Sequence, residues 1–87
     1  MLDFRAEAVL RLLVNSDLAL PPTPIHENLQ LNGETFSKRT VHRKLRHLVE
    51  AGYAEKVLNG KGYYRATEAG HALIESAGEA AGTPIEK

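Results

Sequence analysis

The residues with the clearest chemistry form a run of positive charge in the middle of the chain. The thirteen positions from Ser37 to Val49 contain five Lys or Arg residues, two His residues and no acid. An exposed helix usually mixes the two signs of charge, because opposite charges three or four positions apart attract each other. A run of one sign repels itself, and a polyanion is the simplest partner that compensates this repulsion. The run therefore predicts contact with nucleic-acid phosphates, and a merely solvated helix face is the alternative.

The same run has the spacing of an amphipathic helix. Val41, Leu45, Leu48 and Val49 fall on one side of the helix and form a single apolar stripe. At about 100° per residue, the side opposite this stripe carries Arg39, Arg43, Arg46 and His47. One side of the helix is therefore expected to pack on a core while the other faces a ligand.

Residues near the N-terminal end of such a helix reach deepest into a DNA major groove. The side chains predicted to contact the groove are Lys38, Arg39, Thr40, His42 and Arg43, and those predicted to lie nearer the backbone are Ser37 and Arg46. A second basic group follows, with Lys61 in a Gly-rich turn and Arg65 on the outward face of the strand after it. This group suits contact with phosphates or with the minor groove, and an ordinary soluble turn is the alternative.

Other chemistries find little support in the residue types. The chain contains no Cys, and His42 and His47 diverge by about 140° around a helix, so no metal site is expected. The sequence has no Gly-rich phosphate loop and no nucleophile motif. We therefore expect no catalysis, no cofactor and no small-molecule substrate. Tyr63 and Tyr64 could stack on bases, but strand alternation favours Tyr64 as a core residue.

The elements that must position these residues follow from periodicity and turn residues. Helices are predicted over Asp3 to Asn15, over about Pro24 to Leu31 after a Thr23 cap, over Ser37 to Ala51 after a Ser37 cap, and after Thr67; strands are predicted over Tyr53 to Leu58 and Tyr63 to Ala66. The Asn-Gly step and the second Gly between the strands predict a hairpin. The fold class is thus α+β and mainly α, with three helices, a two-stranded hairpin and a C-terminal helix. Residues 1–77 form the predicted domain, and residues 78–87 form a predicted flexible tail.

Composition agrees with one globular domain, because 43% of the residues are hydrophobic and 25% are charged. No apolar stretch approaches the roughly 20 residues of a membrane span, and no signal peptide is recognisable. The absence of Cys fits an intracellular protein, so we expect a cytoplasmic, nucleoid-associated location. The zero net charge hides an asymmetry: residues 35–65 have a net charge of +6, and each flanking segment has −3. This distribution also favours a polyanion-binding surface.

Residues 36–70 combine three segments in order. They contain S-x-x-T-V-x-R-x-L-x-x-L-x-x-A-G-Y, then a basic Gly-turn hairpin, then Y-R-A-T-E-A-G. The combination resembles the recognition helix, wing and following helix of winged helix-turn-helix transcriptional regulators of the MarR and ArsR-like groups. It is most similar to small archaeal and phage repressor-like proteins. The second predicted helix lacks the E-I-A pattern common in these groups.

The resemblance implies a sequence-specific regulator, a repressor, that binds double-stranded DNA through the helix from Ser37 to Ala51. A domain this small offers few base contacts, so a homodimer on a two-fold site is expected. The first and last helices are the predicted dimer surfaces. Two other hypotheses are a protein–protein adaptor, whose basic face would meet an acidic partner, and an RNA-binding or replication-associated winged helix.

Overall fold

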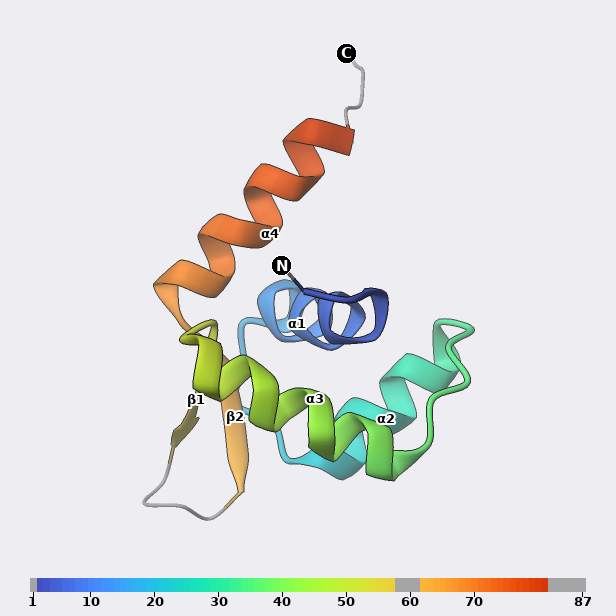
Figure 1. Ribbon diagram of the computed structural model, residues 1–87. Coiled ribbons are helices and arrows are strands. Elements are labelled where there is room, and N and C mark those ends of the chain that lie inside the picture. Colours follow the sequence, from blue (N-terminus) through green and yellow to red (C-terminus); the bar gives the residue numbers. More distant parts are fainter. Residues whose placement is uncertain (1, 58–61, 82–87) are drawn as a thin grey trace.

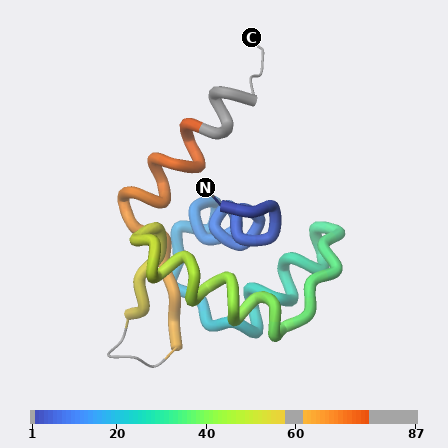
Figure 2. The backbone as a smooth tube through the Cα atoms, in the orientation of Figure 1, coloured from blue at the N-terminus to red at the C-terminus, as the bar shows by residue number. Residues whose placement is uncertain are grey.

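The computed structural model describes residues 2–57 and 62–81. The elements in chain order are α1 (Phe4–Ser16), α2 (Pro22–Leu31), α3 (Lys38–Ala51), β1 (Ala54–Val57), β2 (Tyr63–Ala66) and α4 (Glu68–Ala81) (Figure 1). Figure 2 follows the same path as a tube and shows the hairpin beside one end of α3. This order confirms the predicted α+β, mainly helical fold of a small winged-helix domain.

Helix α1 lies at the centre, with α2 and α3 on one side and α4 on the other (Figure 1). Its Val9, Leu10 and Leu13 are fully buried. They belong to one cluster with the stripe of α3, of which Val41, Leu45 and Leu48 are fully buried, and with Ile25 of α2. Val49 of the stripe is half-buried. The apolar face of α3 is therefore fixed in the core, and its opposite face is left outside.

Three of the predicted caps are present. The Asp3 carboxylate accepts a hydrogen bond from the Ala6 N–H (2.7 Å), and the Ser37 hydroxyl accepts one from the Thr40 N–H (3.1 Å). The Thr67 hydroxyl accepts one from the Gly70 N–H (3.2 Å). Each bond satisfies a backbone donor that the first turn of its helix leaves without a partner.

The predicted start of α2 is wrong by two residues. The helix begins at Pro22, Pro21 occupies the N-cap position without a side-chain hydrogen bond, and Thr23 lies inside the first turn. Proline is tolerated in this turn because its missing N–H would have had no carbonyl partner there. Pro22 and Pro24 can therefore both be helical, and the helix does not require Thr23 as a cap. Its end agrees with the prediction, with Asn32 as C-cap and Gly33 at φ +94°.

The strands pair antiparallel, with Ala54 opposite Ala66 and Lys56 opposite Tyr64. A further bridge joins β2 to the segment between α1 and α2. The Leu20 N–H donates to the Tyr64 carbonyl (2.9 Å), and the Tyr64 N–H donates to the Leu20 carbonyl (2.8 Å). No local pattern in the sequence predicts this bridge. It ties the hairpin to the segment between α1 and α2, and such support matters because two strands alone are only marginally stable.

Helix α4 continues to Ala81, so the boundary predicted at Gly78 lies inside a helix; residues 82–87 of the predicted tail lie outside the described residues. In the part of the chain that the structure describes, no helix has the length and apolar character needed to cross a membrane.

Candidate nucleic-acid interface

Helix α3 is held at both ends. Ser37 caps its start. Gly52 is the C-cap, and its φ of +86° is a left-handed backbone conformation that Gly adopts more easily than other residues. The linker before it is held by a hydrogen bond between His26 Nε2 on α2 and the Phe36 carbonyl (2.9 Å). With the apolar stripe buried, these contacts fix which side chains of α3 face outward.

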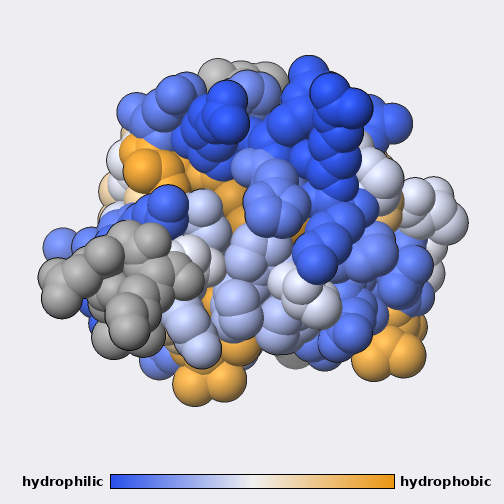
Figure 3. All heavy atoms as spheres, turned by 90° about the horizontal axis from the view of Figure 1, so that it is seen from below, coloured by the Kyte–Doolittle hydropathy of each residue, from blue (hydrophilic) through white to orange (hydrophobic). Residues whose placement is uncertain are grey.

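Helix α3 carries five exposed basic or imidazole side chains from the predicted set: Lys38, Arg39, His42, Arg43 and Arg46. By helical spacing, the three arginines lie opposite the buried stripe, and Lys38 and His42 flank it. Among the described residues, none of these five side chains forms an ion pair. Glu50 is exposed near the C-terminal end of α3 and is the one acid of this helix. Figure 3, which views the molecule from below Figure 1, shows mostly hydrophilic side chains on this side. The structure thus exposes all five of these side chains and gathers the three arginines on the face opposite the core.

The two predicted hydroxyl contacts are engaged with each other. The Ser37 hydroxyl accepts from the Thr40 N–H and donates to Thr40 Oγ1 (3.1 Å). A hydroxyl has one hydrogen to donate, so Ser37 uses its hydrogen within the cap. Thr40 accepts in this pair and keeps its own hydrogen for an outside acceptor.

Lys44 is the α3 cation that the fold partly neutralises. Its Nζ donates to Asp3 Oδ2 of α1 at 2.8 Å, and its side chain is 15% exposed. The hydrogen bond from Lys44, together with that from the Ala6 N–H, lowers the pKa of the Asp3 carboxyl below its ordinary value. Asp3 therefore stays charged and holds Lys44 against α1.

The hairpin places Lys56 beside α3, a residue that sequence analysis did not include in the site. The Lys56 Nζ lies 5.9 Å from the centre of the Tyr64 ring, within the range of a cation–π contact. A shallow groove runs between α3 and the hairpin, lined by His42, Arg46, Val49, Glu50, Lys56 and Tyr64. Lys56 pairs with Tyr64 across the hairpin, so the two side chains lie on the same side of the sheet. Strand alternation alone does not show which side of the hairpin faces α3.

Arg65 lies on the other side of the hairpin, because neighbouring strand residues point to opposite faces. Its guanidinium donates twice to Glu55 Oε2, from Nε at 3.1 Å and from Nη2 at 2.6 Å. The structure therefore does not bring Arg65 together with the α3 cations, and it pairs its charge with an acid. The other predicted hairpin contact, Lys61, lies outside the described residues.

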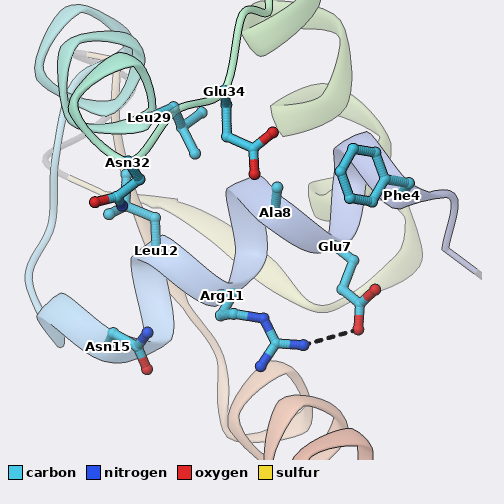
Figure 4. Close-up of a pocket in the computed structure, with 9 residues that line it drawn as sticks. All are labelled: Phe4, Glu7, Ala8, Arg11, Leu12, Asn15, Leu29, Asn32 and Glu34. Carbon is cyan, nitrogen blue, oxygen red and sulfur yellow. Dashed lines mark hydrogen bonds and ion pairs between the residues drawn. The ribbon is translucent and has the colours of Figure 1, made fainter.

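A hollow on the outward side of α1 is lined by acidic side chains, in contrast to the basic face of α3. Figure 4 shows Glu7 and Glu34 beside this hollow, from α1 and from the linker after α2. Arg11 also lines it, but its Nη2 donates to Glu7 Oε2 at 3.0 Å. Two carboxylates and one paired cation disfavour phosphate, so the charge of this side differs from that of the α3 face.

Within the described ranges, no group of three His, Asp or Glu side chains is arranged to hold a metal ion. The candidate site consists of the exposed donors and positive charges of α3 and Lys56. Such a surface binds anions by charge and hydrogen bonding.

The three packed helices, the antiparallel hairpin and the basic outward face of α3 define the class as a winged-helix domain. Residues 7–74 match the family model of the ribonuclease R winged-helix domain. Because the match covers most of the chain, the chain belongs to this family. The match supports the winged-helix fold, and it does not support membership of the MarR or ArsR-like regulators. Searches of curated proteins and of solved structures gave no match.

Proposed function

We propose that this domain binds duplex DNA, with α3 in the major groove and the hairpin against the backbone, and that it acts as a sequence-specific regulator of transcription. The observation that carries the proposal is the exposed surface of α3, where six basic or imidazole side chains have no ion-pair partner among the described residues. Winged-helix domains commonly bind nucleic acid, and here the helix that would enter the groove carries the positive charge.

Helix dimensions favour duplex DNA over duplex RNA. The major groove of B-DNA, about 12 Å wide, admits an α-helix, whereas the major groove of A-form RNA is too deep and narrow for side chains to read. The 14 residues of α3 form a helix about 21 Å long. An exposed helix of this length can contact several base pairs along the DNA groove.

RNA binding is the second candidate function, and the family match favours it. The matched family is named for ribonuclease R, and residues 7–74 include all of α3 and the hairpin. In this case the basic face would contact RNA phosphates and unstacked bases.

Fluorescence anisotropy at low salt tests the choice between these candidates. The chain is titrated into a labelled mixed-sequence DNA duplex, an RNA duplex of the same sequence, and the RNA single strand. We expect the DNA duplex to bind most tightly, with an affinity that falls as salt rises. Tighter binding to either RNA would replace the proposal with the second candidate. Binding to none of them would favour a protein–protein adaptor.

Lys56 and Arg65, on the two sides of the hairpin, allow a matched comparison of DNA binding. Lys56→Gln should weaken DNA binding, because Lys56 lies beside α3 at the groove that Arg46 and Glu50 also line. Arg65→Gln removes the same charge from the same hairpin but from its other side, where Glu55 already pairs with it. Binding titrations of both variants should show the larger loss for Lys56→Gln. A larger loss for Arg65→Gln would mean that the opposite side of the hairpin faces the DNA.

We also propose a homodimer formed through α1 and α4, and the repressor role expected from the sequence stays a prediction. Helix α4 extends past the other helices (Figure 1), so its outer part can meet a second copy. A dimer would double the base contacts that one small domain offers. Light scattering at high protein concentration should give twice the mass of the chain. A monomer under these conditions would contradict the dimer.

A further inference from the structure

A small notch separates the N-terminal end of α1 from α3. It is lined by Arg5 of α1 and by Thr40, Arg43 and Lys44 of α3. Thr40 and Lys44 lie one turn apart, on the flank of α3 opposite to the flank that carries His42 and Arg46. The notch and the hairpin groove therefore border α3 on two different sides.

The Arg5 guanidinium contacts an aromatic ring at the start of α3. Its Cζ lies 5.8 Å from the centre of the Phe36 ring, in cation–π range. Phe36 also meets the Phe4 ring edge to face, with 6.1 Å between centroids, and its carbonyl is bonded to His26. Because Phe36 directly precedes the Ser37 cap, the ring that holds Arg5 is fixed relative to the start of α3. Arg5 is thus positioned before any ligand binds.

The polar groups of the notch are mostly donors. Thr40 retains its hydroxyl hydrogen, because Thr40 Oγ1 is the acceptor of the Ser37 hydroxyl. The Lys44 ammonium has three hydrogens, and Asp3 engages it through one oxygen at 2.8 Å. Arg5 and Arg43 are exposed, and neither forms an ion pair among the described residues. Three cations and one hydroxyl outweigh the single carboxylate of Asp3, so the notch suits an anion with several acceptor oxygens.

We propose that the notch binds a backbone phosphate of the nucleic acid whose groove α3 occupies, and that Arg5 is a phosphate contact. This proposal rests on the proposed function. A helix in a major groove has one phosphate backbone on each flank, and the notch and the hairpin groove provide a cationic site for each. Two flanking contacts would fix the depth and angle of α3 in the groove without reading sequence.

The test compares Arg5→Gln with Arg11→Gln. Both remove one positive charge from α1, but Arg11 lies in the acidic hollow and pairs with Glu7. For Arg5→Gln we expect equal weakening on all duplex sequences and a salt slope of log K smaller by about 0.9, the value for one lost phosphate contact. Arg11→Gln should leave the slope unchanged. If the wild type binds duplex DNA and both variants keep its slope, the notch is excluded while the proposed function stands. If the wild type binds no nucleic acid, both proposals fail.

Asp3→Asn is expected to strengthen binding, whereas Arg5→Gln is expected to weaken it. Asparagine caps a helix about as well as aspartate, so α1 should keep its N-cap. The change removes the carboxylate from beside the notch and releases Lys44, and we expect tighter binding with a steeper salt slope. Weaker binding by a folded Asp3→Asn variant would contradict the proposal.

The source of the phosphate is tested with duplexes that carry one neutral methylphosphonate at successive backbone positions. One position should weaken the wild type and leave Arg5→Gln unaffected, which would assign Arg5 to that phosphate. The second arm titrates inorganic phosphate into the protein alone and follows the Arg5 signals by NMR. Tight saturation by inorganic phosphate, with no sensitive position in the duplex, would overturn the proposal in favour of a site for free anions.

Discussion

Replacing Arg39 and Arg43 together by Gln should weaken binding to duplex DNA by at least about 30-fold, because an arginine contact to a base edge contributes about 1–3 kcal/mol. Both side chains are exposed on the outward face of α3, away from the buried Val41, Leu45 and Leu48. The double variant should therefore keep the fold of the wild type while losing affinity. Anisotropy titrations at constant salt measure the loss, and circular dichroism checks the fold.

Glu50→Gln is the matched control on the same face of α3. Glu50 is exposed and lies on the same side of the helix as the two arginines, but its charge is negative. Its removal should leave the affinity unchanged or increase it, because a carboxylate repels phosphate. Equal loss in the control and in the double variant would mean that the outward face of α3 does not carry the binding.

Base contacts and phosphate contacts of Arg43 can then be separated. Selection of bound duplexes from a random pool supplies a preferred site. If Arg43 reads a base, Arg43→Ala loses more affinity on that site than on random DNA; an equal loss on both assigns Arg43 to phosphate. A two-fold symmetric preferred site would also support the dimer.

The second large effect concerns the packing of α4. Gly70→Ala should lower the free energy of unfolding by about 1–3 kcal/mol, because a methyl group there overpacks a filled site. A Cβ atom at this position would collide with the Tyr53 carbonyl oxygen and would lie 3.1 Å from Leu10 Cδ1. The Tyr53 carbonyl cannot easily move, since it accepts a hydrogen bond from the Thr67 N–H (3.0 Å). Helix α4 would have to shift away from Leu10 of α1 and from the Tyr53 backbone.

Urea or thermal unfolding measures the change in the free energy of unfolding. Its sign shows whether the close contact at Gly70 or the helix propensity of alanine has the larger effect. In an open helix Gly→Ala stabilises by up to about 1 kcal/mol, because alanine has the higher helix propensity. Ala72→Gly, at an exposed position of the same helix, should show this propensity effect alone. If Gly70→Ala stabilised the protein by the amount that Ala72→Gly destabilises it, the close contact at Gly70 would be disproved.

The features predicted correctly from the sequence are those with local signals. The Ser37 cap and the Gly52 stop bound α3, and the apolar stripe fixes its orientation, so the exposed cations of α3 were predictable. The start of α2 was not, because Pro22 and Thr23 both fit a first turn and no side chain caps the helix.

The remaining differences come from contacts between distant parts of the chain. Lys44 meets Asp3, 41 positions away, and Leu20 bridges to Tyr64, so no local pattern reveals either pair. The side of the hairpin that faces α3 is also decided by tertiary packing. Strand alternation places Arg65 and Tyr64 on different faces of the hairpin. It does not show that the face with Lys56, rather than the face with Arg65, lies beside the helix.

The central claim is that the outward face of α3 is the nucleic-acid-binding surface, and chemical-shift mapping by NMR tests it most directly. The backbone amide signals of the isotope-labelled chain are followed while unlabelled duplex DNA is added at low salt. We predict the largest shifts in the first turns of α3, around Lys38, Arg39 and Arg43, with smaller shifts at Lys56 and Arg5. Largest shifts at the acidic hollow around Glu7, Arg11 and Glu34, or no shifts at all, would contradict the claim.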